Sequence, residues 1–138
     1  MAACAQRSAN PLQLDPGVIL RSVNGFLPST LDGRRTGFEC FHDDPVGTID
    51  FLGRGHFPRR GRFALGLRWG GDFDELQAAW MAATAYAAAA DGIIFDHETA
   101  KVVTPAQTRA TVGEIVAARP RVDDAMAEMM KKLSPGST

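Results

Sequence analysis

Apolar residues follow a helical period over one long segment of the chain. Between Asp72 and Gly92 they recur every three or four residues, which is the spacing of one helix face. The positions of this face are Phe73, Leu76, Trp80, Ala83, Ala87 and Ala90. Asp72 is a typical N-cap residue, and Gly92 suits the left-handed position that ends a helix. The pattern predicts one long central helix whose alanine-rich C-terminal half packs closely on its neighbours.

Alternating or short apolar runs predict the strands. The expected strands are residues 18–23, 36–42, 62–69, 92–95 and 101–104. The run Arg62–Trp69 alternates most regularly and has one buried face, formed by Phe63, Leu65, Leu67 and Trp69. Asn24-Gly25 predicts a turn, residues 28–33 and 53–61 predict loops, and the type of the apolar piece 49–52 stays open.

Two shorter helices are expected at the C-terminal end. Thr104 followed by Pro105 and Gln107 has the composition of a helix N-terminus, with a cap residue, a proline at the first position and a glutamine at the third. This helix should stop before Pro120. Val122, Met126, Met129, Met130 and Leu133 then form the apolar side of a last amphipathic helix.

This order of elements predicts an α+β fold. Strands precede a long helix, a hairpin and further helices, and no alternating βαβ units are evident. We expect a mostly antiparallel sheet of about four or five strands, with the central helix and the C-terminal helices packed on one face. Residues 17–134 should form a single domain, preceded by a flexible lead-in over residues 1–16.

Composition and charge narrow the functional classes. The chain has 138 residues, of which 45% are hydrophobic and 22% charged, and its formal net charge is −1. A charge this close to zero gives no general attraction to nucleic acid or to membranes. Cys4 and Cys40 are too few for a disulfide framework and lack metal-binding spacing. Without a signal peptide or a membrane-spanning run, the expected location is the cytoplasm.

His42-Asp43-Asp44 is the densest cluster of residues that can ligate a metal. Together with His97 it supports one alternative function, a metal-dependent hydrolase or nuclease. Neighbouring residues of a strand point to opposite faces, however, and Asp-Asp-Pro is common turn chemistry. No nucleophile motif is evident, so no catalytic residue, metal or cofactor is predicted.

Acidic residues could gather into a patch for a basic partner. The candidates are Glu39, Asp43, Asp44, Asp50, Asp91, Asp96 and Glu98. Complementary charge would speed association and fix the register of the complex. The alternative is an ordinary solvated surface.

The segment Arg54–Arg62 is rich in arginine and contains an aromatic residue, Phe57. Its arginines, which include Arg59 and Arg60, could contact phosphates, and the ring could stack on a base. A small nucleic-acid-binding module is therefore a second alternative function. The same segment could equally be a protein-binding loop, and with a net charge near zero nucleic acid is not the expected partner.

Three segments of residues 37–99 carry a resemblance to a known group of proteins. They are residues 37–44, residues 64–71 and, after the alanine-rich helix, residues 91–99, which read Asp-Gly-Ile-Ile-Phe-Asp-His-Glu-Thr. They resemble small bacterial immunity proteins of polymorphic-toxin and type VI secretion systems. The resemblance implies a non-enzymatic, antitoxin-like protein that binds a cognate toxin and blocks its active site. These families share no catalytic residues.

The binding residues that follow from this interpretation are exposed polar groups. They are Glu39, Asp43, Asp44, Asp96, Glu98, Arg59 and Arg60. A homodimer is left open, because the three methionines of the last helix could pack on their own domain or on a second copy.

Overall fold

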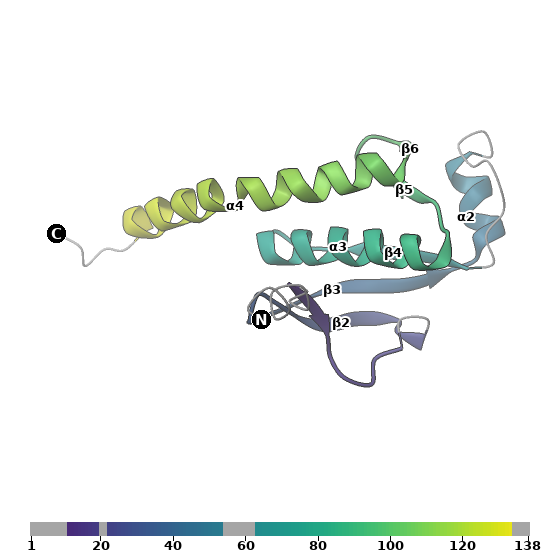
Figure 1. Ribbon diagram of the computed structural model, residues 1–138, viewed down its shortest axis with the longest axis horizontal. Coiled ribbons are helices and arrows are strands. Elements are labelled where there is room, and N and C mark those ends of the chain that lie inside the picture. Colours follow the sequence, from purple (N-terminus) through teal and green to yellow (C-terminus); the bar gives the residue numbers. More distant parts are fainter. Residues whose placement is uncertain (1–10, 20–21, 54–62, 134–138) are drawn as a thin grey trace, which may run out of the picture.

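Four antiparallel strands form the main sheet, and they lie side by side in chain order. The structure is a computed structural model that describes residues 11–19, 22–53 and 63–133. The strands of this sheet are β1 (Leu12–Leu14), β2 (Gly25–Leu31), β3 (Arg34–Asp43) and β4 (Ala64–Arg68). The remaining elements are α2 (Pro45–Leu52), α3 (Phe73–Ala90), the hairpin of β5 (Ile94–Asp96) and β6 (Lys101–Val103), and α4 (Pro105–Leu133). Figure 1 shows three layers, with the sheet on one side of α3 and α4 on the other. The predicted α+β class is confirmed.

The β2–β3 hairpin closes through a two-residue turn at Asp32-Gly33. Both residues have positive φ, 48° and 80°, and Leu31 pairs with Arg34. Such turns match the twist of the strands, and Asp-Gly is one of their typical sequences. The predicted loop at residues 28–33 is therefore wrong, because most of it belongs to β2.

Proline inside a strand explains why β2 was not expected. The carbonyl oxygen of Pro28 accepts from the amide of Asp15 at 3.5 Å, on the β1 side. The N–H that proline lacks would point to the same side, one residue beyond the last β1–β2 pair at Ser29. The β2–β3 ladder is thus unaffected by Pro28.

The strand predicted at residues 18–23 is wrong where the structure describes it. Val18 and Val23 lie in irregular backbone and pack against the core, so their apolar character reflects burial and not pairing. The predicted lead-in over residues 1–16 is wrong for Leu12–Leu14, which pair with β2 as the edge strand β1. Residues 1–10 lie outside the described part of the chain.

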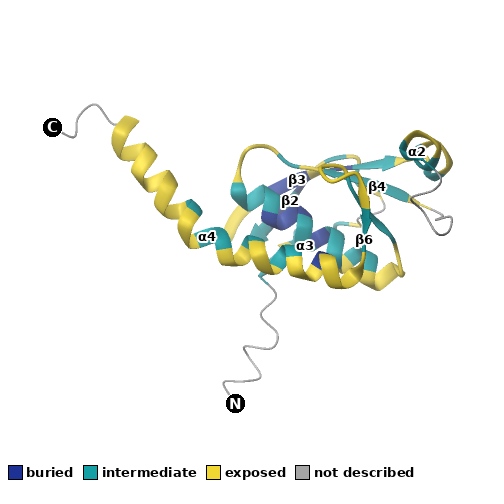
Figure 2. Cartoon of the chain, turned by 90° about the horizontal axis from the view of Figure 1, so that it is seen from above, coloured by how far each residue is buried: buried dark blue, intermediate teal, exposed yellow. Residues whose placement is uncertain are grey.

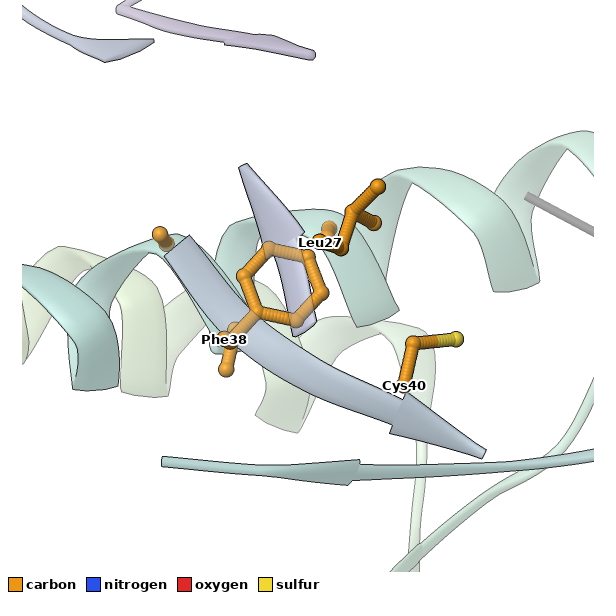
Figure 3. Packing of buried hydrophobic residues seen from close by; sticks show 6 residues of the cluster. Leu27, Phe38 and Cys40 are labelled. Atoms are coloured by element: carbon orange, nitrogen blue, oxygen red, sulfur yellow. The ribbon is translucent and has the colours of Figure 1, made fainter. Parts of the chain in front are cut away.

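The core lies between the sheet and α3 (Figure 3). Its members are Leu27, Phe38, Cys40, Ala78, Ala79 and Ala82. Phe38 and Cys40 are fully buried on one face of β3, as the predicted strand 36–42 required. Burial raises the pKa of the Cys40 thiol. Leu65, Leu67 and Trp69 pack against this cluster from β4 and its end, whereas Phe63 is 51% exposed.

Helix α3 confirms the predicted central helix but buries a different face. Asp72 caps it, accepting from the amide of Asp74 at 2.9 Å. The buried residues are Gln77, Ala78, Ala79 and Ala82, around the middle of the helix, whereas Ala88–Ala90 at its C-terminal end are exposed. Small side chains let the helix backbone approach the sheet, so the bulky stripe through Trp80 is only partly buried.

The left-handed residue that ends α3 is Asp91, with φ 52° and ψ 47°, and not Gly92. An Asp tolerates this conformation better than most residues. The hairpin predicted after it is confirmed, but β5 and β6 form a separate two-stranded sheet.

Helix α4 begins as predicted and ends much later. Thr104 and Gln107 form a capping box, with amide-to-side-chain distances of 2.8 and 3.1 Å. The helix continues through Pro120 to Leu133, so the two predicted helices are one. Figure 2 shows that α4 changes direction in its middle, which is how a helix accommodates an internal proline. Among the described helices, none combines the length and apolar character that crossing a bilayer requires.

Helix α2 includes the apolar piece at residues 49–52, whose type the sequence left open. Asp44 follows the last residue of β3 and caps this helix, and Pro45 occupies its first turn. The helix buries none of its residues, and Phe51 is 88% exposed.

Candidate functional site

The second face of the main sheet carries no helix among the described residues (Figure 1). Side chains alternate along a strand, so the neighbours of the buried Leu27, Phe38 and Cys40 point away from α3. We call this surface the open sheet face. Its residues are Phe26 and Pro28 from β2, Gly37, Glu39, Phe41 and Asp43 from β3, and Gly66 and Arg68 from β4.

Phe26 is the largest exposed apolar group of the open sheet face. Phe26 is 59% exposed, yet one side of its ring lies directly against Gly37. A Cβ at Gly37 would overlap this ring and lie 2.6 Å from the carbonyl oxygen of Leu27. The missing side chain at position 37 therefore seats the aromatic ring against the sheet.

Gly37→Ala is expected to lower the free energy of unfolding by about 1–2 kcal/mol, because the added methyl meets backbone that cannot move aside. Gly66→Ala on β4 is the matched control. Its added Cβ would meet only the movable carboxylate of Asp43, at 3.1 Å, so we expect a change within about 0.5 kcal/mol. Urea unfolding of both variants measures this difference. Equal effects at the two glycines would contradict the seating role of Gly37.

Charges of both signs flank the aromatic groups. Arg68 lies over the ring of Phe41, 5.3 Å from its centroid, and pairs in register with Glu39 on the neighbouring strand. Asp43 stands on the same face beside Gly66. At the other end of β3, Arg35 binds Asp15 through two hydrogen bonds of 2.7 and 3.1 Å. These bonds lower the pKa of the Asp15 carboxyl.

A shallow, open hollow of about 340 Å³ lies beside Phe26. It is lined by Phe26, Pro28, Arg35, Thr36, Gly37, Asp72 and Glu75. Strand β4 ends at Arg68, opposite Glu39, so the start of β3 has no strand partner on that side. The loop before α3 passes through this space. The hollow could receive a side chain of a bound protein.

The expected acidic residues do not share one surface. Glu39 and Asp43 lie on the open sheet face. Asp96 and Glu98 belong to the β5–β6 hairpin, in the layer of α4 (Figure 1). A patch that includes Glu39 and Asp43 therefore does not extend to these two groups, because the hairpin lies on the far side of α3.

Asp44 and Asp96 have local structural roles. The Asp44 carboxylate accepts from the amides of Val46 and Gly47 at 3.3 and 3.1 Å and so caps α2. The Asp96 carboxylate accepts from the amide of Glu98 at 2.9 Å and from a neighbouring threonine hydroxyl at 3.1 Å, which orders the hairpin turn. Both carboxylates are therefore already engaged in hydrogen bonds within the chain.

The residues proposed for a metal are separated. His42 pairs with Leu65 on the α3 side of the sheet, whereas Asp43 points to the open face. His97 packs its ring edge-on against Phe95, at 5.3 Å between centroids. Within the described part of the chain, no three His, Cys, Asp or Glu side chains come together as a metal would require. Arg59, Arg60 and the other arginines of residues 54–62 lie outside the described residues.

An ion-pair network joins the three layers and was not foreseen. Asp74 on α3 binds Arg34 of β3 through bonds of 3.0 and 3.1 Å and also pairs with Arg119 of α4. Arg119 donates to the buried Gln77 at 2.7 and 3.1 Å and lies 4.8 Å from the centroid of Phe73. This contact was missed because the helix that begins at Pro105 was expected to stop before Pro120, which placed Arg119 at the helix end and not inside it.

Comparison with protein-family models gives no match, and no significant match is found among curated proteins or solved structures.

Proposed function

We propose that the protein is an immunity protein that binds a cognate toxin through the open sheet face and blocks its active site. The observation that carries this proposal is the exposed aromatic ring of Phe26, backed by Gly37 and bordered by charged groups. Interface cores favour aromatic and arginine side chains, and a rim of charges sets specificity. The resemblance of residues 37–99 to immunity proteins is the reason for proposing a toxin as the partner.

A rigid sheet suits an inhibitor. Its side chains are held in place by the strand ladder, so binding does not require a loop to be ordered first. Glu39 and Asp43 stand two strand repeats apart on the same face of β3 and offer two carboxylates to a basic cleft. Phe26 and Phe41 supply the apolar contact beside them. Of the acidic residues considered from the sequence, this proposal therefore uses Glu39 and Asp43 alone.

Substitutions on the open sheet face should weaken capture of the partner. We expect a tagged wild-type chain to retain one stoichiometric protein from a lysate of the cells that produce it. Glu39→Lys combined with Asp43→Lys, and separately Phe26→Ala, should weaken that binding at least about tenfold. Glu114→Lys, an exposed position on α4, is the control and should bind normally. Quantitative mass spectrometry at low and high salt measures the retained partner.

The captured protein must also be toxic and be inhibited. Co-expression with the wild-type chain should restore growth of cells that make the partner, whereas co-expression with the Phe26→Ala variant should not. A partner whose activity is unchanged by saturating wild-type protein would contradict the immunity function. Unchanged capture by both open-face variants would instead show that a different surface binds.

A further inference from the structure

Helix α4 extends well beyond the helix it packs on. It has 29 residues, whereas α3 has 18, and the two run antiparallel. Arg119 already reaches Asp74 and Gln77 in the first turns of α3. The residues after Asp123 therefore have no α3 beside them, and Figure 2 shows this end of α4 projecting from the molecule with its surface exposed.

The face of α4 that packs on α3 continues into this projecting end. Thr108 is buried, and Val112, Ile115, Arg119 and Val122 are partly buried, at steps of four and three residues. The next positions in the same series are Met126, Met129 and Leu133, which are 52%, 53% and 70% exposed. We call Val122, Met126, Met129 and Leu133 the overhang stripe. Steps of four and three residues are the pattern of a helix that pairs with another helix.

Residues 123–133 of the projecting helix are all exposed, so no other described element covers this end of α4. A free helix of about a dozen residues is only marginally stable in water, since most helical stability comes from packing of an apolar face. A cluster of exposed methionines on a helix is a surface that readily packs on another apolar face.

We propose that the overhang stripe pairs with the same stripe of a second copy of this chain, as two antiparallel helices about a two-fold axis. The spacing of the stripe is symmetric about its centre. Val122 therefore lies level with Leu133 of the second copy, and Met126 lies level with Met129 of the second copy. Each residue of the overhang stripe therefore has a counterpart on the second copy, and the same residues form both halves of the interface.

Charges on the overhang favour this antiparallel arrangement. Asp123 and Asp124 precede the stripe centre, and Lys131 and Lys132 follow it. Antiparallel pairing brings the acidic turn of one copy level with the basic turn of the other, whereas parallel pairing would set like charges side by side. Among the described residues of one chain, the ion pair of Lys131 is an exposed 3.8 Å contact with Glu128, which is too weak to hold the lysine in place.

The dimer goes beyond the proposed function and is independent of it. The overhang stripe lies at the end of α4, on the other side of α3 from the open sheet face (Figure 1). A homodimer would present two such faces. A failure of toxin binding would leave the dimer unaffected, and a monomeric chain could still bind a toxin.

Analytical ultracentrifugation of the full chain tests the pairing. We expect the wild type to approach twice its monomer mass of 14.8 kDa as concentration rises. Met126→Glu combined with Met129→Glu should raise the dimer dissociation constant at least about tenfold. Ala127→Glu places one negative charge on a different side of the same turn and should leave the dimer intact. Far-UV circular dichroism checks that each variant is folded.

Cysteine cross-linking tests the register. In a Cys4→Ser background, which leaves only the buried Cys40, Met126→Cys and Met129→Cys proteins are mixed and oxidised. Antiparallel pairing predicts that the cross-linked product is mainly the mixed dimer. A monomeric wild type at all concentrations, equal disruption by Ala127→Glu, or cross-links mainly between identical positions would each overturn the proposal.

Discussion

Replacing Phe38 by alanine is expected to lower the free energy of unfolding by about 3–5 kcal/mol. Phe38 is fully buried and is the largest side chain of a small core in which three of the six members are alanines. Its ring fills the space between β3 and α3. Alanine methyl groups cannot move into the resulting cavity, so the variant loses both the burial of the ring and its packing contacts.

Phe51→Ala is the matched control for this experiment. It removes the same side chain from α2, where Phe51 is 88% exposed, and should change stability by less than about 0.5 kcal/mol. Guanidinium unfolding followed by tryptophan fluorescence and circular dichroism measures both variants. A domain of this kind has only about 5–15 kcal/mol of stability, so Phe38→Ala should unfold at clearly lower denaturant concentration. Similar midpoints for the two variants would show that the core does not depend on Phe38.

Local sequence signals predicted the elements that local chemistry determines. The capping box of Thr104 and Gln107, the cap at Asp72 and the alternation of β3 are all present. Each of these signals spans only a few residues and depends on how those residues interact with their own stretch of backbone. They therefore did not depend on knowledge of the partner element.

The misassigned elements are those in which tertiary context outweighs local preference. Pro28 lies in β2 because its missing N–H falls beyond the end of β1, a fact that only the strand order reveals. Pro120 lies within α4, whose first half is held against α3 by contacts such as Arg119 with Gln77. Helix α3 buries alanines and not the stripe through Trp80, because the sheet is approached most closely by the smallest side chains.

The candidate site was predicted only in part. Glu39 and Asp43 were expected as contact residues, and both lie on the open sheet face. Phe26 was missed, since residues 24–25 were expected to be a turn and the face of a strand cannot be assigned before the strand itself. Asp96 and Glu98 were grouped with them because acidic residues in separate segments give no indication of which layer each segment joins.

The network around Asp74 is the second place where a single change should have a large effect. Asp74 binds Arg34 of the sheet and Arg119 of α4, so one carboxylate connects three layers. Its side chain is 18% exposed. Hydrogen bonds from Arg34, above all, hold the pKa of this carboxyl below its usual value, with Arg119 adding to the effect against the opposing influence of burial.

Asp74→Asn is expected to lower the free energy of unfolding at pH 7 by about 2–3 kcal/mol, because two charge-assisted contacts weaken while both guanidinium groups remain. The folded pKa lies below the unfolded value, so the carboxylate contributes its full stability above the unfolded pKa. That contribution is lost as the pH falls through the folded pKa. The gap between wild type and Asp74→Asn should therefore be constant near neutral pH and narrow below about pH 4.

Two comparisons separate this network from general acid effects. Glu114→Gln removes the same charge from an exposed position of α4 and should lie within about 0.5 kcal/mol of wild type at pH 7. A double-mutant cycle of Asp74→Asn with Arg34→Met should give a coupling of about 1 kcal/mol or more, as contacting charged groups do. A gap that is as wide at pH 2.5 as at pH 7 would contradict the role of the ionised carboxylate. If the destabilising effects of the two single substitutions simply add in the double variant, the Asp74–Arg34 contact does not contribute to stability.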